Sequence, residues 1–214
     1  VKPLSNYIKP EDLYDKIDLT LDDNPAIDND FKKTLHQLIL STPKSSSKYF
    51  FNQLFGGLNS KSVVGELLAV VLNNSMATYK IAGPMVELEK EILRKVASLI
   101  DYPKTFGGTF PTGGSMCNFM ALIIARDKKI PEIRNNGKQQ DLVCYSSQNS
   151  HYSMGKNASF AGIGRNNVRY IETNEEGEMC PESLQTTIKK DLNNKLIPFF
   201  VNATVGTTVM GATD

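Results

Sequence analysis

From residue 115 onward, short apolar runs alternate with helical patterns, and this alternation limits the fold more than any other feature. The expected strands are 141–147, 168–173 and 197–204, and the expected helices are 115–128, 152–161 and one that opens at Pro181. Strands joined by helices form a mostly parallel sheet with helices on both faces. We therefore predict an α/β fold in which ligands collect outside the carboxyl ends of the strands.

The first part of the chain has a different pattern. Residues 1–80 are expected to form a helical and linker segment, and 81–214 to form the first part of a large α/β domain. The serine-rich stretch STPKSSSK indicates a linker, and Pro84 is a favourable first residue for a helix. Apolar residues at helical spacing share one face of that helix: Met85, Leu88, Ile92, Val96 and Leu99.

Composition excludes several classes of function. The net charge of +1 comes from interspersed acidic and basic residues, which does not fit a nucleic-acid-binding face. We find no apolar run long enough for a membrane span and expect a cytoplasmic protein. The three cysteines, Cys117, Cys144 and Cys180, lack CxxC spacing and are expected to be reduced structural thiols, with no metal site.

The stretch PTGGSMCNFMAL places a glycine pair and a serine directly before a helical pattern. A glycine-rich bend at a helix start leaves backbone N–H groups unpaired at the positive end of the helix dipole, where a phosphate can bind. In isolation, an ordinary turn with Ser115 as the N-cap explains the pattern equally well. Other parts of the chain must separate the two interpretations.

Two further loops follow expected strands and strengthen the phosphate interpretation. His151 follows the 141–147 strand, and a threonine-rich stretch at 206–208 follows the 197–204 strand. His151 alone is also explained as a helix-start residue without chemistry. Together with Gly114 and Ser115, these loops suit a flat, phosphorylated and hydroxylated ring such as pyridoxal phosphate.

Several spaced motifs make the sequence similar to a known family. They include YFFNQLFGGLN, PTGGSMCNFMALIIARDK, SQNSHYSMGKNASFAGIGRNNV and PFFVNATVGTTVMGATD, and the matching residues span 49–214. The chain resembles the group II pyridoxal-phosphate-dependent amino-acid decarboxylases, which act on glutamate and cysteine sulfinate. This resemblance implies the aspartate-aminotransferase-like fold, pyridoxal 5'-phosphate as cofactor and a homodimer with active sites at its interface.

The resemblance also implies roles for individual residues. Gly114 and Ser115 match the positions that bind the cofactor phosphate. His151 matches the histidine that stacks on the cofactor ring and helps to protonate the substrate carbon after carbon dioxide leaves. Thr208 matches a threonine near the ring hydroxyl, and Gln53 matches a glutamine of the substrate pocket.

Two departures from the family pattern concern the substrate, which the resemblance implies to be an acidic amino acid: aspartate, cysteine sulfinate or glutamate. Phe55 stands where glutamate-specific members usually carry a smaller residue, and Ala77 where many animal members carry an aromatic one. Phe55 as a pocket residue favours a shorter acidic substrate. Simple repacking explains both departures as well, and a non-acidic substrate such as diaminobutyrate is the alternative.

Two functional residues of the family have no counterpart in the sequence. These are the aspartate paired with the ring nitrogen and the lysine linked to the cofactor, and Asp214 matches a different, earlier position. We therefore expect a piece of a longer decarboxylase, inactive on its own. The alternative is a catalytically incomplete relative that acts as a binding or dimer-partner module.

Overall fold

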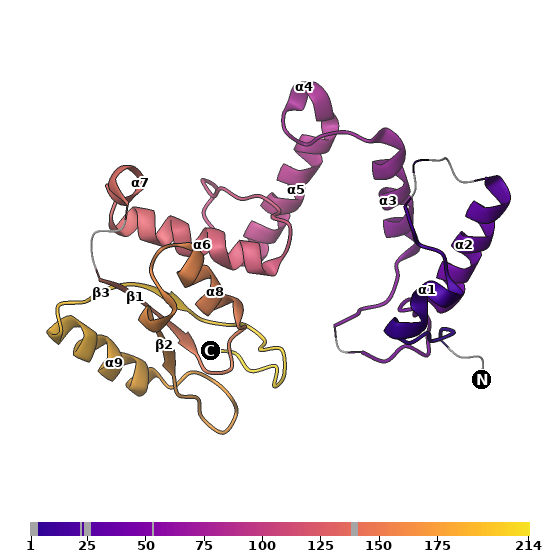
Figure 1. Cartoon of the computed structure of the whole chain (residues 1–214). Helices are drawn as coiled ribbons and strands as arrows, with labels where there is room; N and C mark the ends of the chain where they lie inside the picture. The colour runs from indigo at the N-terminus through magenta and orange to yellow at the C-terminus, as the bar shows by residue number, and fades with distance from the viewer. Residues whose placement is uncertain (1–3, 22, 24–26, 53, 138–140) are drawn as a thin grey trace. The chain divides into compact units, whose positions relative to one another are not determined.

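The chain divides into two compact units, Val1–Gly83 and Pro84–Asp214. A computed structural model describes residues 4–21, 23, 27–52, 54–137 and 141–214, and Figure 1 traces the elements of each unit. The boundary expected from the sequence lay between residues 80 and 81. Because each unit has its own internal contacts, we describe each by itself.

The regular elements among the described residues of the first unit are all helices. Its elements are η1 (Pro10–Asp12), α1 (Leu13–Lys16), α2 (Asp28–Ser41), α3 (Ser60–Leu72) and α4 (Tyr79–Ala82). The Nε2 of Gln37 in α2 donates to the carbonyl of Lys16 at 3.0 Å, and Ile17 beside it is buried. The side chain of Asn59 accepts from the N–H of Lys61 and caps α3.

The second unit is built on a parallel sheet of three strands in the order β2-β1-β3. These are β1 (Leu142–Ser147), β2 (Val168–Ile171) and β3 (Ile197–Asn202). The other elements are α5 (Pro84–Leu99), α6 (Gly114–Lys129), α7 (Ile133–Asn136), α8 (Ser153–Phe160), η2 (Arg165–Asn167) and α9 (Pro181–Asn193).

Helices cover both faces of the sheet. Leu142 and Cys144 of β1 pack in a buried cluster with Leu122 of α6 and Met154 of α8. The alternate residues of β1, Val143 and Tyr145, pack in a second cluster that includes side chains of α9. Figure 1 shows α6 and α8 on one side of the strands and α9 on the other. The expected two-sided parallel sheet is therefore confirmed.

Two strands end earlier than the sequence predicts. The strand expected at 168–173 ends at Ile171, since Thr173 pairs antiparallel with Met179 instead. The strand expected at 197–204 ends at Asn202, because the N–H of Thr204 donates to the side chain of Asp214 and leaves the sheet ladder. Both ends free the chain to form loops at the carboxyl edge of the sheet.

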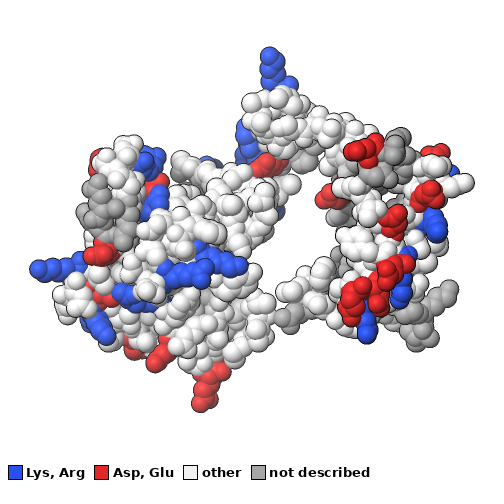
Figure 2. All heavy atoms as spheres, in the orientation of Figure 1, with Lys and Arg blue, Asp and Glu red and all other residues white. Residues whose placement is uncertain are grey.

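Large apolar side chains remain exposed in both units. On α3, Val70 and Val71 are 75% and 79% exposed. On α5, the apolar face expected from the sequence is also exposed, with Leu88 at 56% and Leu99 at 70%, whereas Leu93, which lies next to Gly108, is outside that face. On the face drawn in Figure 2, broad areas of both units are white, which means that they carry no charged side chains.

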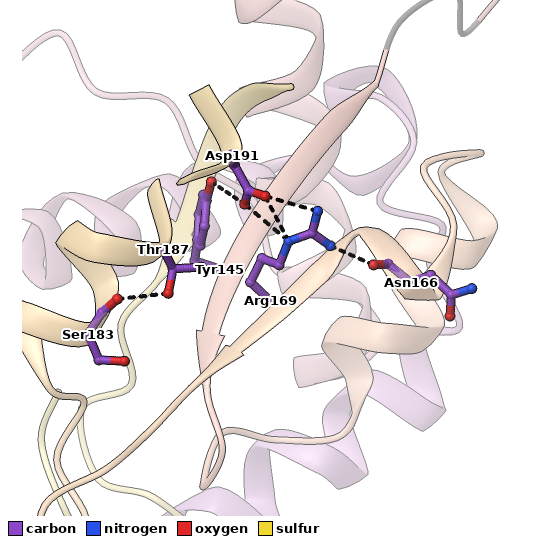
Figure 3. Close-up of polar contacts among 6 residues, drawn as sticks. All are labelled: Tyr145, Asn166, Arg169, Ser183, Thr187 and Asp191. Atoms are coloured by element: carbon purple, nitrogen blue, oxygen red, sulfur yellow. Dashed lines mark hydrogen bonds and ion pairs between the residues drawn. The ribbon is translucent and has the colours of Figure 1, made fainter. Parts of the chain in front are cut away.

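A buried carboxylate joins α9 to the sheet (Figure 3). Asp191 accepts from the hydroxyl of Tyr145 at 2.9 Å and from Nε and Nη2 of Arg169 at 3.0 to 3.2 Å. Burial is the main cause that raises the pKa of Tyr145, and the hydrogen bond to Asp191 adds to it. The hydroxyl therefore stays protonated and serves as a donor at neutral pH.

The start of α6 depends on a glycine backbone. Its N-cap is Gly113, with φ of 149° and ψ of 164°, a region that is essentially restricted to glycine. Gly114 is the first residue of the helix, so Ser115 lies inside the first turn. The interpretation in which Ser115 is the N-cap is therefore wrong.

We expect Gly113→Ala to lower the free energy of unfolding by about 1–3 kcal/mol, because alanine is strained at this φ and ψ. The matched control is Gly114→Ala, at a helical position where an added Cβ meets no atom within 4 Å. This control should be neutral or slightly stabilising. Urea unfolding measures both, and equal stabilities would contradict the backbone assignment.

We expect Tyr145→Phe to lower the free energy of unfolding by about 1–3 kcal/mol, since Asp191 loses one donor in a buried site. Tyr102→Phe is the control, because the side chain of Tyr102 is exposed. Thermal unfolding of both variants checks the difference. A stability of Tyr145→Phe like that of the wild type would show that the hydroxyl adds nothing.

Candidate functional site

Three loops of the second unit carry the residues expected to bind a ligand. They are the turn into α6, the loop between β1 and α8, and the loop that follows β3. Since β1 and β3 are parallel neighbours, the loops after them leave the sheet at the same edge. This edge is the carboxyl edge, where ligands bind in open α/β sheets.

The turn into α6 presents a helix N-terminus. Gly114 and Ser115 are both exposed, and the first N–H groups of a helix have no acceptor within it. The carbonyl of Ser115 accepts from Nδ2 of Asn157 in α8 at 3.1 Å. The turn is thus attached to α8 and offers backbone N–H groups and the Ser115 hydroxyl to an anion.

His151 lies just before α8. Its Nδ1 accepts from the backbone N–H of Ser153 at 3.2 Å, and its ring centroid lies 4.3 Å from that of Tyr152. An accepting Nδ1 places the proton of the neutral ring on Nε2, so the ring offers Nε2–H as a donor. The hydroxyl of Ser153 accepts from Nδ2 of Asn118 in α6 at 3.0 Å. Two contacts therefore join the turn into α6 and the His151 segment through α6 and α8.

Thr208 lies in a compact loop after β3. An isolated bridge pairs Val205 with Thr213 at the base of this loop. Inside it, Thr207 is buried, and its hydroxyl accepts from the N–H of Ala212 at 3.0 Å. Thr208 itself is exposed, on the loop that leaves the same edge of the sheet as the His151 segment.

Asp214 is a residue of this edge for which sequence reasoning found no role. Its carboxylate accepts from the hydroxyl of Ser147 and the N–H of Thr204, both at 3.0 Å, and from the N–H of Met179 at 2.8 Å. The only sequence signal was a run of hydroxyl residues at the strand ends. These contacts join the ends of β1 and β3 to the segment after β2.

The two expected substrate residues belong to the first unit. Gln53 lies outside the described residues. Phe55 is 55% exposed and meets the ring of Phe50 edge-on, with centroids 5.5 Å apart. The contact with Phe50 fixes the ring locally, and the substrate role of Phe55 stays a prediction.

The structure also describes the three cysteines and the grouping of possible metal ligands. The three cysteines are free thiols, of which Cys117 is exposed and Cys144 is buried, and burial raises the pKa of Cys144 to about 12. Across the described ranges, no three His, Cys, Asp or Glu side chains gather as metal ligands. No helix in the same ranges is both long and apolar enough to cross a bilayer.

The donor set fits a phosphorylated ring. A phosphate fits the backbone N–H groups and hydroxyl at the start of α6, and a hydrogen-bonded imidazole stands on the connected segment before α8. Such an arrangement can bind a phosphate at one end of a planar cofactor and contact the ring at the other. Gly114, Ser115 and His151 are thus joined by α6 and α8, and Thr208 lies on the loop that follows β3 at the same edge.

Comparisons with known proteins agree with this chemistry. The sequence model of the pyridoxal-dependent decarboxylase conserved domain matches residues 10–214. The chain is 36% identical to an acidic amino acid decarboxylase of Xenopus tropicalis over 96% of this chain and 40% of the relative. It is 35% identical to cysteine sulfinic acid decarboxylase of Homo sapiens over 96% of this chain and 42% of the relative.

A crystal structure of mouse CSAD has the same fold, with a TM-score of 0.94 and 34% identity, over 98% of this chain and 45% of that chain. The chain therefore spans less than half the length of these relatives. The expected fold class, that of the pyridoxal-phosphate-dependent decarboxylases, is confirmed. Because the family model matches nearly all of its length, the chain belongs to the pyridoxal-dependent decarboxylase family.

Proposed function

We propose that the complete protein containing this chain decarboxylates an acidic amino acid with pyridoxal 5'-phosphate as cofactor. The observation that carries the proposal is that hydrogen bonds between α6 and α8 connect the start of α6 to the His151 segment. The Thr208 loop leaves the sheet at the same edge. The family match and the names of its relatives support the same chemistry. They do not favour the alternative of a binding module without activity.

The proposed cofactor contacts follow from the donors present. Gly114 and Ser115 bind the phosphate through their backbone N–H groups, and Ser115 adds its hydroxyl. Thr208 lies near the ring hydroxyl. When bound, the cofactor supplies an electron sink for the pair left on the substrate carbon when carbon dioxide departs.

His151 is the proposed catalytic residue. The contact from Ser153 to Nδ1 holds the imidazole by one nitrogen and leaves Nε2–H as the donor that the neutral ring can offer to a ligand. Nε2 is therefore the atom that we assign to proton transfer toward the substrate carbon. Rigid placement of this ring limits the reaction to one geometry, as positioned acid–base groups do.

A homodimer is proposed on the basis of exposed surface. Large apolar side chains of α3 and α5 are exposed. A second copy that covers these helices accounts for their composition. A cytoplasmic location is proposed with it, from the free thiols.

Gln53 and Phe55 remain the residues that we propose to contact the substrate. Residues 1–80 then serve as the helical segment that supplies substrate contacts, and 81–214 as the first part of the cofactor-binding domain. Phe55 as a pocket floor reduces depth and favours aspartate or cysteine sulfinate over glutamate. This proposal predicts a graded preference, because one methylene changes binding by about 1–3 kcal/mol.

We expect His151→Ala to lower kcat of the complete protein at least about a hundredfold, the scale of a positioned acid–base group. His36→Ala is the matched control, since His36 is the other histidine of this chain and lies exposed on α2. Ser115→Ala should instead weaken cofactor binding by about 1.5–3 kcal/mol. Carbon dioxide release and cofactor titration measure the two effects, and full turnover by His151→Ala would remove its catalytic assignment.

We expect aspartate, cysteine sulfinate and glutamate to be decarboxylated in preference to aromatic or basic amino acids, with the two shorter acids preferred. The test is a panel of amino acids incubated with the complete protein and pyridoxal phosphate, with carbon dioxide release as the readout. Fastest release from diaminobutyrate or an aromatic amino acid would reject the acidic substrate and retain the decarboxylase.

A further inference from the structure

Asp214 accepts the last hydrogen bond in a row of hydrogen-bonded hydroxyl groups. Its two carboxylate oxygens each face a backbone donor, the N–H of Met179 at Oδ1 and the N–H of Thr204 at Oδ2. Donors on both oxygens fit an ionised carboxylate, which only accepts. The hydroxyl of Ser147 must therefore donate to Oδ2, at 3.0 Å.

The direction of every further bond follows from that one. Ser147 has a single proton, so the hydroxyl of Ser150 donates to Ser147 Oγ, at 3.0 Å. By the same count, the hydroxyl of Thr204 donates to Ser150 Oγ, at 3.1 Å. The amide of Asn202 donates to Ser150 and Thr204 at 3.4 Å, which agrees with both acting as acceptors. Hydrogen bonds aligned in this way strengthen one another.

This row of hydroxyl groups holds the starts of the two loops that carry His151 and Thr208. Ser150 immediately precedes His151, so its two bonds fix the backbone from which the imidazole projects. Thr204 and Asp214 bond to each other through both backbone and side chain, which closes the loop that carries Thr208. One carboxylate therefore determines where both loops begin.

We propose that Asp214 is a positioning residue that sets His151 and Thr208 relative to the sheet through Ser147, Ser150 and Thr204. The inference rests on the proposed function, because it assigns Asp214 to the same site. Asp214 acts through the loops that carry His151 and Thr208.

The test variant is Asp214→Asn in the complete protein. An amide has one acceptor and one donor end, so one of the backbone N–H groups of Met179 and Thr204 must then face another N–H. We expect kcat to fall roughly 10- to 100-fold through misplacement of His151, with KM changed less than about threefold. Hydrogen exchange should become faster in segments 148–152 and 203–213.

A matched pair of variants separates positioning from stability. Ser147 and Tyr145 are both buried on β1, and each donates one hydrogen bond from its hydroxyl to an aspartate. Ser147 donates to Asp214 at 3.0 Å, and Tyr145 donates to Asp191 at 2.9 Å. Ser147→Ala should lower kcat and speed exchange in the two site loops. Tyr145→Phe should destabilise the protein similarly, speed exchange in α9 and leave kcat unchanged.

The outcomes decide between the hypotheses. Wild-type kcat in folded Asp214→Asn and Ser147→Ala, or an equal loss in Tyr145→Phe, would overturn the positioning role. If Asp214→Asn does not fold, Ser147→Ala and Tyr145→Phe decide alone. A wild-type protein that decarboxylates no amino acid would reject the proposed function, whereas unchanged exchange in the two loops would reject the role of Asp214 independently.

Discussion

The second unit depends on one strand that is buried on both faces and at both edges. All six residues of β1 are buried, with β2 and β3 paired to either side. A strand in this position has no exposed surface along its length, and its side chains either pack in the core or form buried hydrogen bonds. The strand can contribute to a functional site only at its carboxyl end, where Ser146 and Ser147 replace the apolar residues and the loops begin.

Two aspartates use the same strand in different ways. Asp191 accepts from Tyr145 and carries an ion pair with Arg169, so its buried charge is compensated by a fixed cation. Asp214 accepts from two backbone N–H groups and the Ser147 hydroxyl, which are neutral donors. The carboxylate of Asp191 attaches α9 to the sheet, and the carboxylate of Asp214 connects the loops that follow β1 and β3. This difference is why a loss at Asp191 should change stability and a loss at Asp214 should also change turnover.

Local sequence signals predicted most of the second unit and part of its site. Strand and helix periods identified the elements, and the glycine turn, His151 and the threonine-rich exit were visible as loop residues after strands. Asp214 could not be predicted, because its partners Ser147, Met179 and Thr204 are 67, 35 and 10 residues away in sequence. The N-cap at Gly113 was missed for a different reason, since serine has the stronger statistical preference but the backbone turn required a glycine φ.

The exposed apolar faces of α3 and α5 also show what the sequence could not predict. Periodicity predicted the helix at α5 but could not show which side is covered, and most of the apolar face that defined the period lies exposed, whereas Leu93 is half-buried. Helices of this length gain most of their stability from packing of an apolar face rather than from intrinsic propensity. The proposed second copy would therefore supply folding energy to α3 and α5 as well as an interface. On this view, association and helix formation are one process, and substitutions that break the dimer would also lower helix content.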